Sequence, residues 1–277
     1  MDSVGSRRAG HSVAGTGLTR REFAGVLLAS TLGLGWVPGR PADWARPRAR
    51  LTVRPKAAAK GQSAQPGPQP LALAEDRDGV LYVPRDYRPE KPLPLILTLH
   101  GATGSSRGPV RNFGPLADEL GVALVVPDSR GRTWDAILLG EFGPDRDFID
   151  SALEAAWSRV QVDPRRIGVA GFSDGATYAL ALGRANGDLF GGVAAFSPGF
   201  LIPVDAVGRP QVFISHGTHD SILPIDSCSR RIVPELRRLG YSVTYQEFDG
   251  DHTVPRELAA PGLAASVGQR HESEKDH

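Results

Sequence analysis

The sequence has very little cysteine, with one residue, Cys228, in a chain of 277. A single cysteine cannot form a disulfide within the chain, so packing and hydrogen bonds must hold the fold together. Cys228 lies in a segment with a helical pattern, and we interpret it as a packing residue. Cys and His spacings typical of zinc sites are absent as well, so the sequence predicts no metal site.

The chain also lacks net charge, at +1, but this value conceals an asymmetry. Residues 1–60 contain 11 Lys and Arg against 3 Asp and Glu, whereas the remainder carries a formal net charge of −7. An acidic folded domain argues against a nucleic-acid partner. The basic N-terminal segment therefore needs a separate explanation.

A long apolar run is missing too. Arg20 and Arg21 precede an uncharged stretch, residues 23–37, that is shorter than the about 20 residues a membrane helix needs. The segment fits the apolar part of a signal peptide, and Thr-Arg-Arg-Glu-Phe resembles a twin-arginine signal. We expect residues 1–37 to engage the export machinery and the protein to be periplasmic or extracellular. There are two alternatives: the arginines are a chance basic patch before a buried helix, or the segment is an anchor that is not cleaved.

Composition divides the rest of the chain into three parts. Residues 38–70 are rich in Pro, Arg, Ala and Gln without periodicity, which predicts a disordered linker. Regular helix and strand signals over 71–265 predict one folded domain, and residues 266–277 form a charged tail. We therefore expect a chain without residues 1–60 to be soluble and active.

Buried-strand signals alternate with helix signals through this domain. Strands are expected at 79–84, 93–100, 122–127, 166–171, 191–198, 210–217 and 241–250, and helices around 112–121, 147–160, 174–185 and 228–240. Such alternation with short connections predicts a mostly parallel sheet with helices on both faces. Ligands bind beyond the carboxyl ends of parallel strands, so polar residues at those ends are candidates for function.

One such residue is Ser173, in Gly-Phe-Ser-Asp-Gly at 171–175, where a strand should turn directly into a helix. Alone, G-x-S-x-G is a weak motif, and a tight turn without chemistry is the alternative. In this position the two glycines would let the backbone pack closely around a strained turn that projects the serine Oγ above the sheet edge. Such a serine is a candidate nucleophile.

A serine hydroxyl needs a base and the base needs an orienting carboxylate. His252 lies in the loop after the last strand, and Asp220 lies just past the preceding strand. Asp226 is better placed to start or cap a helix, and Asp205 follows an earlier strand. We therefore predict that Ser173, Asp220 and His252 act together.

Backbone donors for an oxyanion are expected at two turns. Ala102 follows the strand 93–100 in His-Gly-Ala-Thr-Gly, and Asp174 follows the serine, so their N–H groups are the candidates. The first turn has no P-loop lysine, which disfavours the alternative of phosphate binding. His100 and His216 each precede a glycine at a strand end, and we interpret both as supporting residues.

The long loop after 122–127 contains apolar residues that could form a substrate pocket. Trp134 and Leu138 from this loop, with Phe200 from a later one, are the candidates. Ordinary loop packing is the alternative interpretation for all three. Charges of both signs nearby select neither an acidic nor a basic substrate.

Several segments in combination resemble the α/β-hydrolase superfamily, more narrowly its phospholipase/carboxylesterase group. They are LHGATG, DPRRIGVAGFSDGA, AFSPG, HGTHDSILPI and EFDGDHTVP, within about residues 75–260. The resemblance implies an α/β-hydrolase fold, no cofactor, and hydrolysis of small-molecule esters by Ser173, His252 and Asp220. Two features depart from the group. The segment after His252 is short and interrupted by Pro261, and residues 197–210 leave no room for a cap domain.

The function expected from these features is that of an exported serine carboxylesterase for small or aromatic esters. A peptidase, thioesterase or polyester depolymerase would use the same three residues, and a binding protein that kept the fold without activity is a third possibility. Fold alone does not separate these functions.

Overall fold

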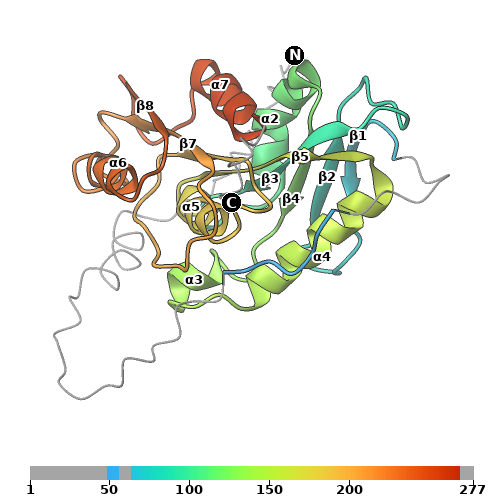
Figure 1. Ribbon diagram of the computed structural model, residues 1–277, viewed down its shortest axis with the longest axis horizontal. Coiled ribbons are helices and arrows are strands. Elements are labelled where there is room, and N and C mark those ends of the chain that lie inside the picture. The colour runs from blue at the N-terminus through green and yellow to red at the C-terminus, as the bar shows by residue number, and fades with distance from the viewer. Residues whose placement is uncertain (1–48, 56–63, 269–277) are drawn as a thin grey trace, which may run out of the picture. The chain divides into compact units, whose positions relative to one another are not determined.

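The computed structural model describes residues 49–55 and 64–268, so the predicted signal, residues 1–37, lies outside the described residues. Eight strands form one sheet in the order β1-β2-β4-β3-β5-β6-β7-β8. Neighbours from β4 through β8 are parallel, whereas the β1–β2 and β2–β4 pairs are antiparallel (Figure 1). The strands are β1 (Gly67–Pro70), β2 (Gly79–Val83), β3 (Leu93–Leu99), β4 (Ala123–Pro127), β5 (Val162–Phe172), β6 (Gly192–Phe196), β7 (Gln211–Gly217) and β8 (Val243–Phe248).

Helices cover both faces of this sheet. The helices are α2 (Arg107–Leu120), α3 (Asp135–Leu138), α4 (Pro144–Arg159), α5 (Asp174–Ala185), α6 (Ser229–Arg238) and α7 (Arg256–Ser266). Helices α2 and α7 lie on one face and α4 and α5 on the other, while α6 packs on β7 and β8 (Figure 1). Within the described ranges, no helix is long and apolar enough to cross a bilayer.

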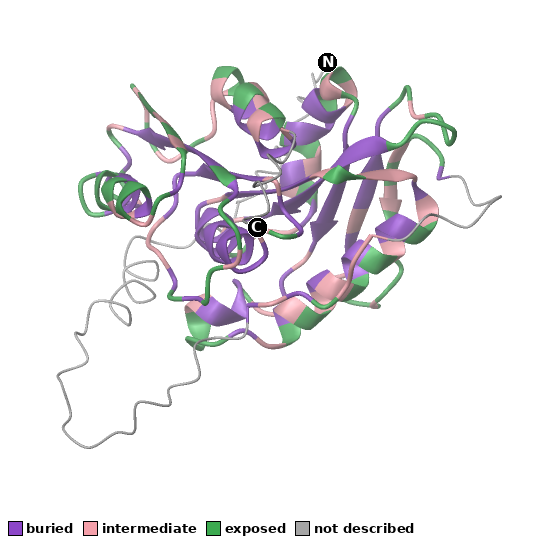
Figure 2. Cartoon of the chain, in the orientation of Figure 1, coloured by how far each residue is buried: buried purple, intermediate pink, exposed green. Residues whose placement is uncertain are grey.

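The central strands are buried on both faces, as the continuous apolar runs predicted. Along β3, Leu95 and Leu97 join the core beneath α4 and α5, and Ile96 between them joins the core beneath α2 and α7. Successive side chains of a strand point to opposite faces, so both layers must be apolar. Buried residues accordingly fill the middle of the sheet (Figure 2). The predicted mostly parallel sheet with helices on both faces is confirmed.

The prediction of a disordered linker over 38–70 is wrong for the part that the structure describes. Ala49 and Leu51 are buried, and Asn186 donates its side-chain amide to the Ala49 carbonyl and accepts from the Leu51 N–H, both at 2.8 Å. We call residues 49–55 the strap. Further along, β1 pairs with β2 at the sheet edge, where a strand tolerates proline. Deleting residues 1–60 would therefore remove part of the fold.

A second difference concerns the end of the domain. Helix α7 runs without interruption through Pro261. Proline removes one hydrogen bond from a helix, but packing of an amphipathic face contributes more to helix stability than any single bond. Leu263 is fully buried, and Gly262 lies against the rings of Phe196 and Phe213. Between β6 and β7, residues 197–210 form no helix or strand, consistent with the predicted lack of a cap domain.

Candidate active site

The turn from β5 into α5 holds Ser173 in a strained conformation. Its φ is 57° and its ψ is −122°, a region that costs a non-glycine residue on the order of 1–3 kcal/mol. A Cβ added at Gly171 would lie 2.1 Å from the carbonyl oxygen of Gly175, and one added at Gly175 would lie 2.3 Å from the oxygen of Leu99. Both glycines are therefore required by close backbone contacts. The turn is further fixed by the Ser173 N–H, which donates to the Phe196 carbonyl at 2.9 Å.

Three side chains that follow different strands meet above this turn. Nε2 of His252 lies 2.9 Å from Oγ of Ser173, and its Nδ1 lies 2.6 Å from Oδ2 of Asp220. Ser173 and Asp220 are buried and His252 is half-buried. With its Nδ1–H donated to the carboxylate, the imidazole keeps Nε2 free to accept the serine proton. The structure thus brings together the three residues that the sequence singled out.

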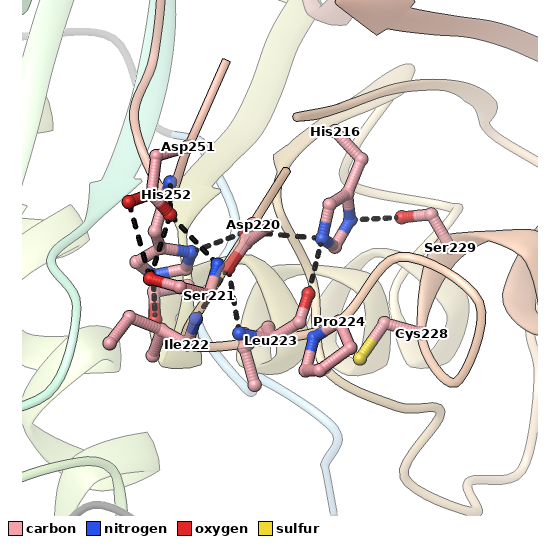
Figure 3. Close-up of polar contacts among 12 residues, drawn as sticks. His216, Asp220, Ser221, Ile222, Leu223, Pro224, Cys228, Ser229, Asp251 and His252 are labelled. Atoms are coloured by element: carbon pink, nitrogen blue, oxygen red, sulfur yellow. Dashed lines mark hydrogen bonds and ion pairs between the residues drawn. The ribbon is translucent and has the colours of Figure 1, made fainter. Parts of the chain in front are cut away.

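The carboxylate of Asp220 is held by four donors. Its Oδ1 accepts the N–H groups of Ile222 at 3.0 Å and Leu223 at 2.7 Å. On the side away from His252, Nε2 of His216 lies 3.2 Å from Oδ2 and 2.8 Å from the Leu223 carbonyl (Figure 3). A carbonyl only accepts, so this Nε2 carries a hydrogen, which the Leu223 carbonyl and the carboxylate share. Nδ1 of the same fully buried ring contacts Oγ of Ser229 at 2.7 Å.

These donors decide the charge of Asp220. Burial by itself raises the pKa of this carboxyl, but hydrogen bonds from His216, His252 and the Leu223 N–H outweigh burial and hold the pKa well below its usual range. The side chain therefore remains an anion, the form that stabilises a protonated imidazole. His216, expected only to be a supporting residue, provides one of these bonds. The sequence did not show that His216 contacts Asp220, because this contact depends on how the turn at 220–223 folds.

A second aspartate ties the loops after β7 and β8 together. Oδ1 of Asp251 accepts the N–H of Ser221 at 2.8 Å and that of His252 at 2.7 Å (Figure 3). The ring of Phe172 packs against the imidazole, with centroids 4.6 Å apart. Asp226, the alternative carboxylate, is exposed and pairs with Arg230 at 2.8 Å. The position of His252 is thus set by contacts from two neighbouring elements.

The turn after β3 runs beside the serine. A Cβ added at Gly101 would lie 3.2 Å from the Cβ of Ser173. Among the described residues, the N–H of Ala102 has no hydrogen-bond partner, and Asp174 begins α5, where N–H groups lack partners within the helix. These are the two donors that the sequence suggested for an oxyanion, and their N–H groups remain available to one.

His100 holds this turn through hydrogen bonds of both ring nitrogens. The Ser129 N–H donates to Nε2 of His100 at 3.0 Å, so Nε2 is unprotonated and Nδ1–H donates to the Gly101 carbonyl at 2.7 Å. Burial lowers the pKa of His100, which keeps the ring neutral. The interpretation of His100 as a supporting residue agrees with these contacts.

A cavity of about 490 Å³ opens beside the imidazole. It is bordered by His252 and Ala102, and its apolar walls come from Phe113, Phe172 and Val254. In the described ranges, no group of three or more His, Cys, Asp or Glu side chains is arranged to hold a metal ion.

None of the predicted pocket residues, Trp134, Leu138 and Phe200, lines this cavity. Trp134 is fully buried, and its Nε1–H donates to the His100 carbonyl at 2.9 Å. Leu138 is exposed at 47%, and Phe200 packs partly buried against the core. The alternative of ordinary packing holds for Trp134 and Phe200, because their loops fold back onto the domain.

Comparison with known proteins agrees with this architecture. The fold matches an S-formylglutathione hydrolase from Staphylococcus aureus, with a TM-score of 0.60, 16% identity and coverage of 78% of this chain and 100% of that one. It also matches a ferulic acid esterase from Anaeromyces mucronatus, with a TM-score of 0.55, 18% identity and coverage of 79% and 97%. The chain therefore has an α/β-hydrolase fold, as its sequence motifs suggested.

In sequence, the chain is similar to curated esterases. The chain is 30% identical to feruloyl esterase C of Emericella nidulans over 158 residues, 54% of this chain and 57% of the enzyme. The curated relatives are matched over only 42 to 57% of their lengths. No family model matches the chain.

Proposed function

We propose that the protein is a serine hydrolase that cleaves carboxylic esters through an acyl-enzyme on Ser173. The observation that carries this proposal is the hydrogen-bonded series from Ser173 through His252 to Asp220, placed on a strained turn beside an open cavity. Similarity to feruloyl esterase C supports an ester as the substrate.

In the first half of the reaction, Nε2 of His252 takes the Oγ proton of Ser173 while Oγ attacks the ester carbonyl carbon. The N–H groups of Ala102 and Asp174 would stabilise the oxyanion, and Asp220 stabilises the imidazolium. The C–O bond to the alcohol then breaks, and the imidazolium gives its proton to the departing oxygen. In the second half, His252 takes a proton from water while the water oxygen attacks the acyl carbon. The bond from that carbon to Oγ then breaks, the imidazolium returns its proton to Oγ, and the carboxylic acid leaves.

A small or aromatic acyl or alcohol group fits the cavity best. Phe113, Phe172 and Val254 provide apolar walls on the side next to His252. A volume of about 490 Å³ suits a small molecule rather than a folded protein domain. An aromatic ester such as a ferulate is one compound of this size and character.

Turnover of matched substrates tests the proposal. We expect p-nitrophenyl acetate and methyl ferulate to be cleaved faster than an acyl thioester or an aminoacyl anilide, and a fluorophosphonate to abolish this activity. Faster cleavage of the thioester or anilide would reassign the protein to a thioesterase or peptidase. A protein that neither cleaves these compounds nor reacts with the fluorophosphonate would be a binding protein.

We propose further that residues 1–37 direct export by the twin-arginine route, on the basis of Arg20 and Arg21 before the apolar stretch. The double change Arg20→Lys with Arg21→Lys keeps the charge and should leave active enzyme in the cytoplasm of a bacterial host. Deleting residues 1–48, which spares the strap, should also leave active enzyme in the cytoplasm. Unchanged export of the Lys-Lys variant, measured by fractionation, would rule out this route.

A further inference from the structure

The cavity beside His252 contains positive charge without negative charge. Its lining includes Arg107 and Arg111 and no aspartate or glutamate. Both arginines are exposed on α2, four residues apart, so they share one face of the helix. This differs from the folded domain as a whole, since the chain after residue 60 has an excess of acidic residues.

No ion pair within the described ranges neutralises these two guanidinium groups. Nε of Arg111 makes one long contact, 3.4 Å, with Oδ1 of its neighbour Asn112. The carboxylates around α2 have other partners. Asp128 accepts the Ser106 N–H, Asp118 pairs with Arg85 and Glu119 pairs with Arg256.

The placement of Arg107 and Arg111 does not stabilise α2. Like charges four residues apart on a helix repel each other. Arg107 is moreover the first residue of α2, where a positive charge opposes the helix dipole, and the first turn holds no acidic residue. A destabilising pair that borders a cavity is better explained by a ligand than by stability.

We propose that the enzyme prefers esters that carry a carboxylate elsewhere in the molecule, with that carboxylate held by Arg107 and Arg111. This inference rests on the proposed esterase function and specifies its substrate class. Guanidinium groups bind carboxylates through paired hydrogen bonds, and two of them on one wall suit a single anionic group. The apolar side chains Phe113, Phe172 and Val254 then contact the part of the substrate between the carboxylate and the ester.

Matched pairs of esters test this preference on both sides of the scissile bond. The acyl side compares the p-nitrophenyl monoester of adipic acid with p-nitrophenyl hexanoate. The alcohol side compares para-carboxyphenyl acetate with para-carbamoylphenyl acetate. We expect kcat/KM to favour the anionic member in at least one pair, and added salt to reduce the preference because exposed charges are screened.

The double variant Arg107→Gln with Arg111→Gln should lower kcat/KM about 10-fold for the favoured anionic ester, from the combined loss of two exposed charge contacts. The neutral partner should change less than about 2-fold, since the change leaves the reacting groups intact. Arg231→Gln, an exposed arginine on α6 outside the cavity, is the matched control and should leave both rates unchanged.

Binding provides a readout that does not require turnover. Calorimetry should show that adipate monoamide binds more tightly than adipamide, and that the double arginine variant loses the difference. The proposal would be overturned if the double variant lost kcat/KM equally for charged and neutral esters. It would also be overturned if neither pair showed an anionic preference and the two amides bound equally. Efficient cleavage of neutral esters in that case would leave the esterase function standing, whereas absence of all ester cleavage would count against that function instead.

Discussion

The loop after β4 and the loops after β7 and β8 leave the same edge of the sheet, but they use their polar residues differently. In the β4 loop, Asp135 accepts the hydroxyl of Tyr178 at 2.9 Å and the Gly143 N–H at 2.8 Å, so its hydrogen bonds hold the loop to the domain. After β7 and β8, Asp220 and His252 bond to each other across two loops and leave one imidazole nitrogen directed at Ser173.

The difference shows that a polar residue at a strand end does not by itself mark a reactive group. The β4 loop bonds to α5 and to the turn after β3, and it turns its large side chain, Trp134, into the core. In the other two loops, Asp220 bonds to His252, and His252 bonds to the serine turn. The reactive side chains in this protein are those that bond to one another in series and end at Oγ of Ser173.

Ser173→Ala should have the largest effect. We expect kcat for ester hydrolysis to fall by about 10³-fold or more, because the nucleophile is lost. The melting temperature should change little, since Oγ contacts only His252 among the described residues. A folded Ser173→Ala protein with near-normal turnover would mean that the loops after β7 and β8 do not serve a nucleophile at Ser173.

Asp220→Asn should come next, with kcat lowered by about 10²- to 10⁴-fold because the amide favours the wrong imidazole tautomer. Asp226→Asn, an exposed carboxylate a few residues along the chain, is the control and should change kcat less than about 2-fold. Steady-state kinetics of both variants check the ranking. The reverse ranking would assign the orienting carboxylate to Asp226.

His216→Phe should lower kcat about 10-fold with little change in KM, because it removes a buried donor to Asp220. His216→Gln, whose amide can replace the Nε2 donor, should restore part of the rate. In an Asp220→Asn background, His216→Phe should cost much less, since its effect passes through the carboxylate. Full additivity of the two changes would mean that His216 acts only on general stability.

Trp134→Phe probes the β4 loop, and there we expect a loss of stability rather than of rate. The change leaves the buried His100 carbonyl without its donor, which costs about 1–3 kcal/mol of unfolding free energy. Activity of the folded variant on p-nitrophenyl acetate should stay within about 3-fold of the parent. Urea unfolding and kinetics together check this pair of outcomes. A raised KM without loss of stability would return Trp134 to the substrate pocket.

The smallest effect is expected at the strap. Arg50 and Arg54 pair with Asp188 at 2.6 and 2.8 Å, and the hydrogen bond from Arg50 is the main cause that lowers the pKa of Asp188 to about 2. A carboxyl with a depressed pKa stabilises the folded state above its unfolded pKa of about 4, and this contribution disappears as the pH falls through about 2.

Asp188→Asn should therefore reduce the unfolding free energy at pH 7 by less than about 1 kcal/mol, because the pair is partly exposed to solvent. The gap between parent and variant should close as the pH approaches 2. Urea titrations at several pH values check the trend. A gap that is constant over this range would show that the ion pairs do not attach the strap.

Much of the fold could be predicted because its signals are local. The runs at 93–99, 122–127 and 167–171 are almost entirely apolar, as strands buried on both faces require. Strand β1 gives no such signal because its four residues alternate between half-buried and exposed at the sheet edge. Helix α3 has four residues, too few for a helical period.

The candidate site was predictable only in part. Ser173, Asp220 and His252 could be chosen because chain order and strand ends restrict where such residues can meet. The cavity walls could not, since the direction of a loop side chain depends on how the loop folds. Phe113 and Arg107 on α2 have the pattern of ordinary helix residues, and Trp134 has the pattern of a pocket residue although it is buried.

The central claim, that Ser173 is the nucleophile, is tested most directly by trapping its acyl-enzyme. The protein is mixed rapidly with p-nitrophenyl acetate, quenched in acid, digested and analysed by mass spectrometry. The account predicts an acetyl group on Ser173 in the parent and none at that position in Ser173→Ala. Steady hydrolysis with no acetyl group on Ser173, or with one on another residue at kinetically competent rates, would contradict it.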